Sequence, residues 1–185
     1  FLVYDDIPNM HDINFSEIIK SLVDRKQISG LVIKEPYYSI SDIDRLELMR
    51  KYLKPKKIIL IDRDGVINVK APEGKYIENW SAFEWIDDTV QSMLQLSFEG
   101  FSFIVITNQA GVSRGMVSEQ ELSKMHRLMI KELKRQNITV LDVYACLHHW
   151  DENCECRKPR AGLFNKISND YRLRMDKTLY IGDDV

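Results

Sequence analysis

Two carboxylates separated by a single residue stand directly after the apolar run 58–61, in the segment Asp62-Arg63-Asp64-Gly65. If the loop curls, both carboxylates face one pocket, and Gly65 permits such a curl because it has no Cβ. One carboxylate could then attack an electrophilic centre while the other donates and accepts a proton. An Asp-Gly pair is also common in ordinary polar turns. By itself, the segment fits a plain turn as well as a catalytic site.

A second group of reactive side chains lies between residues 146 and 156, which contain all three cysteines of the chain. The arrangement is Cys146-x-His148, five intervening residues, and Cys154-x-Cys156. Three thiolates and an imidazole suit tetrahedral Zn²⁺, and a site with four protein ligands is structural, not catalytic. His149 competes with His148 for the fourth position, and three ordinary reduced cysteines are the alternative to a metal. Because a scarce residue clusters so completely, we expect Zn²⁺ here.

The elements that must position these groups are expected to alternate between strands and helices. Four short apolar runs are typical of strands buried on both faces. They lie at 58–61, at 103–106, at about 143–146 and at 178–181. Amphipathic helical patterns separate them, and one of these begins with the capping box Ser118-x-x-Glu121. The alternation predicts an α/β fold, a doubly wound parallel sheet with helices on both faces.

The carboxyl ends of the strands should meet at one edge of this sheet. Right-handed crossovers between parallel strands direct every strand the same way, and doubly wound sheets hold their ligands at that edge. The polar residues at or just beyond the strand ends are Asp62, Asp64, Thr107, Lys158 and Asp183. We expect them to surround one site.

These residues, in this order, resemble the haloacid dehalogenase superfamily of phosphatases. The resemblance rests on Asp62-x-Asp64-Gly-Val after the first strand, Thr107 after the second, Lys158 further on, and Gly-Asp-Asp at 182–184. It implies a Rossmann-like fold and a phosphoryl transfer in which Asp62 attacks phosphorus to form an aspartyl-phosphate. Asp64 would protonate the leaving oxygen and then deprotonate the water that hydrolyses this intermediate.

The same resemblance implies a Mg²⁺ ion, which offsets the repulsion between an anionic nucleophile and an anionic phosphate. Its ligands would be the carboxylate of Asp62, the main-chain carbonyl of Asp64, and Asp183. Thr107 would donate a hydrogen bond to the phosphoryl group, and Lys158 would neutralise charge on its oxygens. Taken singly, Thr107 could also be a helix cap and Lys158 a solvated surface charge.

At its end, the chain departs from the superfamily pattern. The superfamily places a further acid a few residues beyond 182–184, and we expect Asp184 to take part of that role. The chain starts with Phe1, without an initiating methionine, and stops at Val185 directly after an apolar strand. We therefore expect a fragment whose phosphatase domain is incomplete at the C-terminus.

A narrower resemblance covers residues 57–185. It is to the family of D-glycero-D-manno-heptose 1,7-bisphosphate 7-phosphatases and, to a lesser degree, to the histidinol-phosphatase branch, which shares the zinc loop. The segments that carry it are 62–66, Asn68, 107–111, Arg114-Gly115 and 146–159. It implies a phosphorylated sugar as substrate, with contacts from Asn108, Gln109, Arg157 and the segment 70–73. The alternatives are histidinol phosphate as substrate, and a zinc-stabilised domain without catalytic activity.

Residues 1–54 are expected to form a separate unit, because Lys54-Pro55-Lys56-Lys57 breaks the preceding helical pattern. Helices are expected at about 15–23, capped by Asn14, and at about 43–53, with a short strand at 31–33. The stretch resembles the closing segment of a sugar-1-phosphate nucleotidyltransferase, although the Gly-rich nucleotide-binding start of that family is absent. A helical extension that packs on the phosphatase is the alternative. A fusion with a nucleotidyltransferase would favour the heptose substrate.

The composition excludes several other classes of protein. The 185 residues include 26 basic and 28 acidic side chains without a long basic run, which argues against a nucleic-acid partner. The longest apolar run is far below the roughly 18 residues that a membrane span needs. An odd number of cysteines argues against a disulfide framework, and we expect a reducing, cytoplasmic setting.

Overall fold

The structure, a computed structural model, describes residues 14–30 and 39–183. The chain divides into two compact units, residues 1–52 and residues 53–185. The expected strand at 31–33 and the expected contribution of Asp184 lie outside the described residues.

The described part of the first unit consists of two helices. Helix α1 (Phe15–Asp24) begins after Asn14, whose side chain accepts a hydrogen bond from Ser16 N at 3.1 Å. This is the N-cap arrangement that the sequence predicts. Helix α2 (Ile43–Tyr52) follows, and none of the described residues of either helix is buried.

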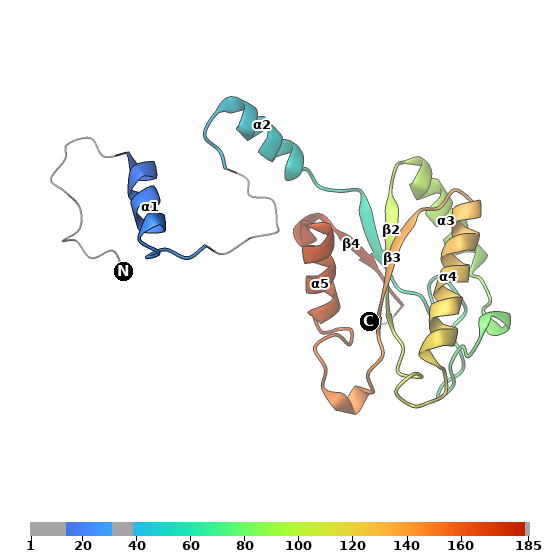
Figure 1. The fold of residues 1–185 in the computed structure, drawn as a ribbon. Coiled ribbons are helices and arrows are strands. Elements are labelled where there is room, and N and C mark those ends of the chain that lie inside the picture. The colour runs from blue at the N-terminus through green and yellow to red at the C-terminus, as the bar shows by residue number, and fades with distance from the viewer. Residues whose placement is uncertain (1–13, 31–38, 184–185) are drawn as a thin grey trace. The chain divides into compact units, whose positions relative to one another are not determined.

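The second unit contains a four-stranded sheet in which all neighbouring strands are parallel (Figure 1). Its strands are β1 (Ile58–Ile61), β2 (Ser102–Asn108), β3 (Val140–Cys146) and β4 (Leu179–Ile181). The order β3-β2-β1-β4 shows that the chain winds outward from β1 to β3 and then returns to the other side of β1. The sheet is therefore doubly wound, as predicted. Its switch point lies beside β1, where such sheets form their ligand crevice.

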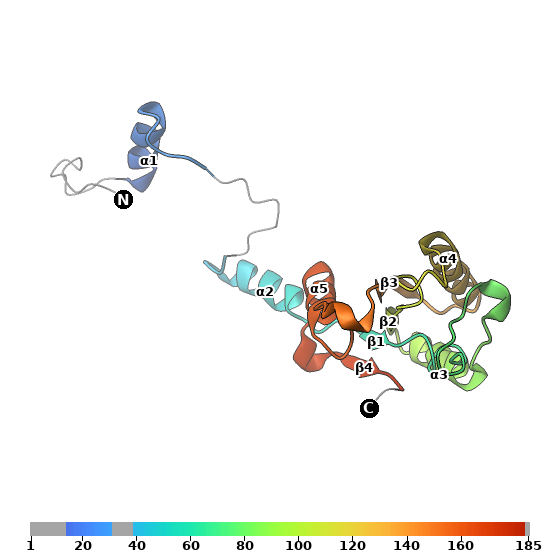
Figure 2. The same cartoon turned by 90° about the horizontal axis from the view of Figure 1, so that it is seen from below.

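Helices cover both faces of the sheet (Figure 2). Helices α3 (Asp87–Phe98) and α4 (Glu119–Arg135) lie on one face, and α5 (Gly162–Tyr171) lies on the other. The side chain of Ser118 accepts a hydrogen bond from Glu121 N at 3.1 Å and caps α4 as the motif predicts. Single 3₁₀ turns stand between these elements. They are η2 (Trp80–Ala82), η3 (Trp150–Glu152) and η4 (Met175–Lys177).

The core has two halves because successive side chains of a strand point to opposite faces. Ile59 and Ile61 of β1 pack with buried residues of α3 and α4, whereas Ile58 and Leu60 pack with Leu163 and Ile167 of α5. Burial of each such side chain contributes about 1.5–3 kcal/mol. A strand buried on both faces has no polar alternation, which explains the continuous apolar run of β1.

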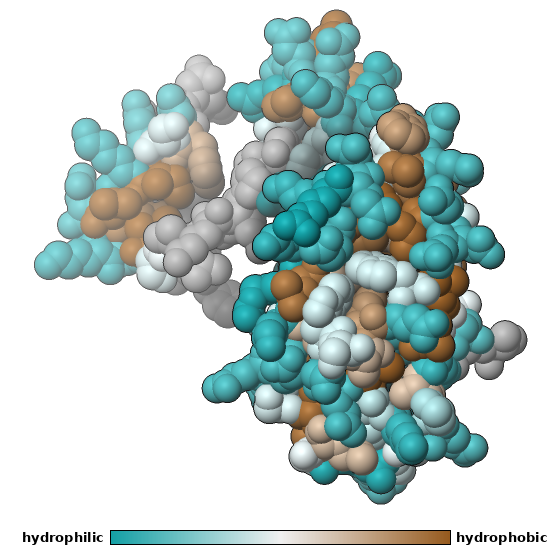
Figure 3. Space-filling model, turned by 90° about the vertical axis from the view of Figure 1, so that its right-hand side faces the viewer, coloured by the Kyte–Doolittle hydropathy of each residue, from teal (hydrophilic) through white to brown (hydrophobic). Residues whose placement is uncertain are grey.

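Strand β4 is not buried, whereas we expected helices to cover both faces of the whole sheet. Leu179, Tyr180 and Ile181 are all exposed, Leu179 to 63%. Among the described residues, β4 pairs with β1 on one side and forms an edge of the sheet. On the face of the second unit shown in Figure 3, apolar surface is interrupted by hydrophilic side chains. No helix in the described part of the chain is long and apolar enough to cross a membrane.

Candidate active site

Asp62 and Lys158 form a buried ion pair at the carboxyl end of β1. Asp62 directly follows the strand, and its backbone N–H donates to the carbonyl of Ile181 in β4 at 2.8 Å. Lys158 Nζ contacts Asp62 Oδ2, and the two side chains are only 8% and 7% exposed. Burial raises the pKa of Asp62, although the hydrogen bond and the charge of Lys158 act in the opposite direction. The ion pair places the predicted nucleophile and the predicted phosphate-binding cation in direct contact.

Asn108, the last residue of β2, holds the backbone of Lys158. Its side-chain Oδ1 accepts a hydrogen bond from Lys158 N at 3.0 Å, and its Nδ2 donates to Lys158 O at 3.1 Å. The side-chain amide thus pairs with both backbone groups of Lys158, as the backbone of a neighbouring strand would. The segment that follows the cysteine cluster is thereby fastened to the end of β2.

The carboxylate of Asp64 accepts five hydrogen bonds from three side chains. The guanidinium of Arg63 donates from Nε and Nη2 to Oδ1 at 3.1 and 2.9 Å, and from Nη2 to Oδ2 at 2.8 Å. Asn68 Nδ2 donates to Oδ1 at 2.9 Å, and Gln109 Nε2 donates to Oδ2 at 2.6 Å. Gln109 Nε2 also donates to Thr107 Oγ1 at 2.8 Å. The predicted acid–base residue is therefore held in one orientation, next to the predicted phosphate-binding threonine.

Arg63 is itself anchored from behind. Its side chain is buried, Nη2 donates to Gln109 Oε1 at 3.0 Å, and Nη1 lies 3.0 Å from His126 Nε2 in helix α4. Burial and the nearby charge of Arg63 lower the pKa of His126 to about 3. His126 is therefore a neutral acceptor at the back of the site.

Asp183 lies against the loop that follows β1. A Cβ on Gly65 would overlap the carboxylate of Asp183, and the φ of Gly65 is +84°. Asp183 Oδ2 pairs with Lys70 Nζ at 3.0 Å. Two carboxylates, Asp62 and Asp183, therefore flank the same loop, and each is contacted by a lysine.

A cavity of about 290 Å³ opens in front of these groups. Asp62, Asp64 and Thr107 line it, together with the segment 70–77. Arg157 lies instead beside a smaller cavity of about 140 Å³, which it shares with Lys158. Arg157 Nη1 is buried and has no hydrogen-bond partner among the described residues.

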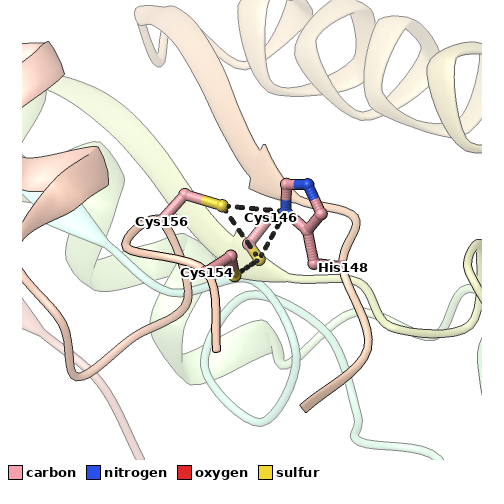
Figure 4. A group of neighbouring side chains, drawn as sticks. All are labelled: Cys146, His148, Cys154 and Cys156. Atoms are coloured by element: carbon pink, nitrogen blue, oxygen red, sulfur yellow. Dashed lines mark hydrogen bonds between the residues drawn. The ribbon is translucent and has the colours of Figure 1, made fainter. Parts of the chain in front are cut away.

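The cysteine cluster closes into a compact group of four ligand atoms (Figure 4). Cys146 Sγ lies 3.5 Å from Cys154 Sγ and 3.3 Å from Cys156 Sγ, and His148 Nδ1 lies 3.0 Å from Cys156 Sγ. Ligand bonds of about 2.0–2.3 Å to a tetrahedral Zn²⁺ put neighbouring ligands roughly 3.3–3.8 Å apart. The cysteines are not disulfide-bonded. The donor types fit Zn²⁺, and the distances between the cysteine sulfurs given above lie within this range.

Comparison with known proteins identifies the family. Residues 57–185 match the family described as polynucleotide kinase 3 phosphatase. Over 129 residues the chain is 34% identical to the D-glycero-alpha-D-manno-heptose-1,7-bisphosphate 7-phosphatase of Campylobacter jejuni, an alignment that covers 70% of this chain and 72% of that relative. The chain therefore belongs to the family described as polynucleotide kinase 3 phosphatase, and it is a phosphatase of the haloacid dehalogenase type.

Two further relatives agree with this phosphatase assignment. The D-glycero-beta-D-manno-heptose-1,7-bisphosphate 7-phosphatase of Yersinia pestis is 31% identical over 134 residues, or 69% of this chain and 70% of its own length. The solved structure of the D,D-heptose 1.7-bisphosphate phosphatase from B. bronchiseptica, complexed with magnesium and phosphate, superposes with a TM-score of 0.65 at 26% identity. It covers 69% of this chain and 70% of that one. These relatives are named as phosphatases, which supports an enzyme over a zinc-stabilised domain without catalytic activity.

The predicted site residues of the phosphatase fall into two groups. Asp62, Asp64, Thr107 and Lys158 meet at the carboxyl end of β1 and β2, with Asp183 beside them. Among the residues predicted to contact substrate, Gln109 reaches the cavity wall, but its amide is occupied by Arg63, Asp64 and Thr107. Asn108 likewise uses its amide on Lys158. Their observed contacts position catalytic groups, and their roles toward substrate stay predictions.

The sequence analysis did not predict a role in the site for Arg63 or His126. Arg63 occupies the position between the two aspartates, and a basic residue between two acids just beyond a buried strand is a signal that could have been used. His126 lies four residues after Leu122 and three before Met129, on the apolar side of α4. A histidine on a buried helix face needs a polar partner. The identity of that partner follows only from the packing.

Replacement of Gly65 by alanine is expected to lower both stability and activity. The left-handed backbone costs a residue with a Cβ about 1–2 kcal/mol, and the new methyl group must also displace Asp183. Gly100→Ala is the matched control, because Gly100 has a φ of +83° and its nearest atom, Lys57 Cδ, lies at 3.8 Å. Urea unfolding should show a loss in both variants, while phosphate release should fall at least about tenfold only in Gly65→Ala. Equal activity of the two variants would argue that Asp183 has no part in the site.

Proposed function

We propose that this phosphatase is a Mg²⁺-dependent phosphomonoesterase that removes the 7-phosphate of D-glycero-D-manno-heptose 1,7-bisphosphate, a reaction of heptose-nucleotide and surface-polysaccharide biosynthesis. The observation that carries the catalytic part is the convergence of Asp62, Asp64, Thr107 and Lys158 at the switch point of the sheet. The names of the relatives support the substrate.

In the first step, a carboxylate oxygen of Asp62 attacks phosphorus while the bond from phosphorus to the sugar oxygen breaks. The products are an aspartyl-phosphate and an alcohol. Asp64 donates the proton that this alcohol oxygen needs. The arrangement is suited to this step, because Asp62, although largely buried, lines the same cavity as Asp64.

In the second step, water attacks the phosphorus of the aspartyl-phosphate. Asp64 accepts a proton from the water, the bond from phosphorus to the Asp62 oxygen breaks, and inorganic phosphate leaves. The five hydrogen bonds that Arg63, Asn68 and Gln109 donate to Asp64 hold its carboxylate in one orientation for this step. Asp64 acts as an acid in the first step and as a base in the second, because it has lost its proton by the time the water attacks.

Lys158 and Thr107 stabilise the transferred group. The Lys158 ammonium contacts Asp62 and lies where negative charge develops on the phosphoryl oxygens. Thr107 Oγ1 accepts from Gln109, so its own proton is available for a phosphoryl oxygen. Both residues are held by backbone contacts at strand ends, which limits their movement during the reaction.

The residues present fit Mg²⁺. The carboxylate of Asp62, the main-chain carbonyl of Asp64 and the carboxylate of Asp183 would hold it, and these are the hard oxygen donors that Mg²⁺ prefers. When bound, the ion supplies positive charge that offsets the repulsion between Asp62 and the phosphate. The magnesium and phosphate in the B. bronchiseptica relative support this assignment.

Cationic side chains in the cavity and near it favour a substrate with a second anionic group. Lys70 and Lys75 line the cavity together with Glu73, and Lys70 Nζ is paired with Asp183. Arg157 has a buried Nη1 without a partner among the described residues. Arg114 lies over the rings of Tyr76 and Trp150, with its Cζ 5.7 and 5.2 Å from their centroids. Such groups make strong contacts with a phosphate and repel the cationic amine of histidinol phosphate.

We therefore expect kcat/KM for D-glycero-D-manno-heptose 1,7-bisphosphate to exceed that for histidinol phosphate by at least about tenfold, which corresponds to 1.4 kcal/mol in the transition state. Phosphate release from the two esters, measured side by side, tests this. Heptose 7-phosphate serves as the matched control, since it differs from the bisphosphate only in lacking the second phosphate. Equal rates for the bisphosphate and histidinol phosphate would contradict the heptose assignment.

We also propose that the Cys146, His148, Cys154 and Cys156 cluster holds a structural Zn²⁺ ion, and that the protein acts in the reducing cytoplasm, where free thiols persist. Residues 1–54 are proposed to be a separate unit, the tail of a nucleotidyltransferase fused to the phosphatase domain at 57–185. The proposed binding partner of the site is its substrate, a small phosphorylated sugar.

A further inference from the structure

We propose that His126 and Arg63 are positioning residues, which fix the carboxylate of Asp64 in the orientation that transfers protons to the leaving oxygen and from water. The proposal rests on the proposed role of Asp64 as acid and base. The backbone N–H of Arg63 donates to Asp62 Oδ1 at 2.7 Å, but in the described hydrogen bonds neither its guanidinium nor the ring of His126 contacts Asp62. The effect of these two side chains on the reaction is therefore expected to pass through Asp64.

Arg63 connects the catalytic loop to two other elements of the fold. One edge of its guanidinium holds both oxygens of Asp64, at distances between 2.8 and 3.1 Å. The remaining donors reach Gln109 Oε1 beyond β2 and His126 Nε2 in α4. The side chain is 1% exposed. A buried arginine with partners on three sides cannot rotate without leaving donors unpaired, so Asp64 cannot rotate with it.

His126 is the contact of Arg63 that lies outside the active-site loops. Arginine has donors only, so His126 Nε2 must be the acceptor and the proton of the neutral ring must be on Nδ1. The helix that carries His126 is rigidly placed, because its neighbours Met125 and Met129 are fully buried in the core. His126 thus anchors the guanidinium to the core rather than to another loop.

The orientation of Asp64 matters because proton transfer depends steeply on distance. General acid–base catalysis contributes about 10²- to 10⁴-fold, and a displacement of about 1 Å can remove much of it. Asp62 and Lys158 contact neither Arg63's guanidinium nor His126 in the described hydrogen bonds. Loss of the anchor should therefore impair protonation of the leaving group more than the attack on phosphorus.

The test compares His126→Leu with His126→Gln in the full chain. Leucine fills the space but removes the acceptor, whereas glutamine restores a polar acceptor near the position of Nε2. The value of kcat/KM reports the steps up to departure of the leaving group. We measure it for the heptose 1,7-bisphosphate, whose alkoxide needs a proton, and for 4-nitrophenyl phosphate, whose phenolate does not.

We expect His126→Leu to lower kcat/KM for the bisphosphate at least about tenfold and for 4-nitrophenyl phosphate less than about threefold, with His126→Gln within threefold of wild type on both. Equal losses on the two esters, or a glutamine variant as impaired as the leucine variant, would overturn the positioning role. Should His126→Leu fail to fold, Arg63→Lys replaces it, since lysine keeps the charge but cannot hold Asp64 and His126 together. It is expected to show the same selective loss, and a wild-type response to both esters would overturn the proposal. Wild-type enzyme without turnover of either ester would refute the proposed function itself.

Discussion

Replacement of Asp62 by asparagine is expected to lower kcat by at least about a thousandfold while the chain stays folded. Asparagine keeps the size of the side chain and an oxygen that can accept from Arg63 N, the hydrogen bond that Asp62 Oδ1 makes at 2.7 Å. It lacks the anionic oxygen that attacks phosphorus. Lys158 loses its ionic partner, but its Nζ keeps the hydrogen bond to Tyr180 Oη at 3.0 Å.

Phosphate release from the heptose bisphosphate measures the effect, and circular dichroism shows whether the fold is kept. Asp87→Asn is the matched control, because it makes the same chemical change at an exposed position in the first turn of α3. Its activity should equal that of wild type. Turnover by Asp62→Asn within tenfold of wild type, about 1.4 kcal/mol in the barrier, would remove Asp62 from the role of nucleophile.

Loss of the zinc ligands is expected to produce the second large effect. Binding of a structural Zn²⁺ contributes directly to folding, and the cluster ends only two residues before Lys158. Cys154→Ser and His148→Gln should each lower the zinc content well below one ion per chain. They should also increase protease cleavage between residues 144 and 160 and reduce kcat at least about tenfold, since Lys158 then loses its support on that side.

His149→Gln separates this effect from a general disturbance of the loop. His149 stands next to His148, but its side chain accepts from Asp151 N and its ring packs on Trp150 at 3.8 Å between centroids. The variant should therefore keep its zinc, as measured by elemental analysis. Wild-type protein that contains no zinc after purification without a chelator would refute the metal assignment for the whole cluster.

The sequence by itself predicted a set of candidate site residues and determined which elements hold them. Apolar runs without alternation indicate strands buried on both faces, and β1 and β2 are such strands. Because parallel strands end at one edge, the positions of Asp62 and Thr107 at strand ends were enough to predict that they meet. The spacing of three cysteines and a histidine within eleven residues was likewise enough to predict that these side chains gather in one group, since a short loop can close on itself without help from the rest of the fold. The zinc ion that they would hold stays a prediction.

Only the tertiary structure decided the contacts between residues far apart in the sequence. A periodic pattern shows that a side chain of α4 faces the core, but it does not say which strand or loop the helix covers. The contact between Arg63 and His126 spans 63 positions and forms because α4 packs on one face of the sheet. The amides of Asn108 and Gln109 are turned toward Lys158 and Asp64 for the same reason. Hydrogen-bond partners of buried polar groups depend on where separate elements dock, and local sequence does not encode that docking.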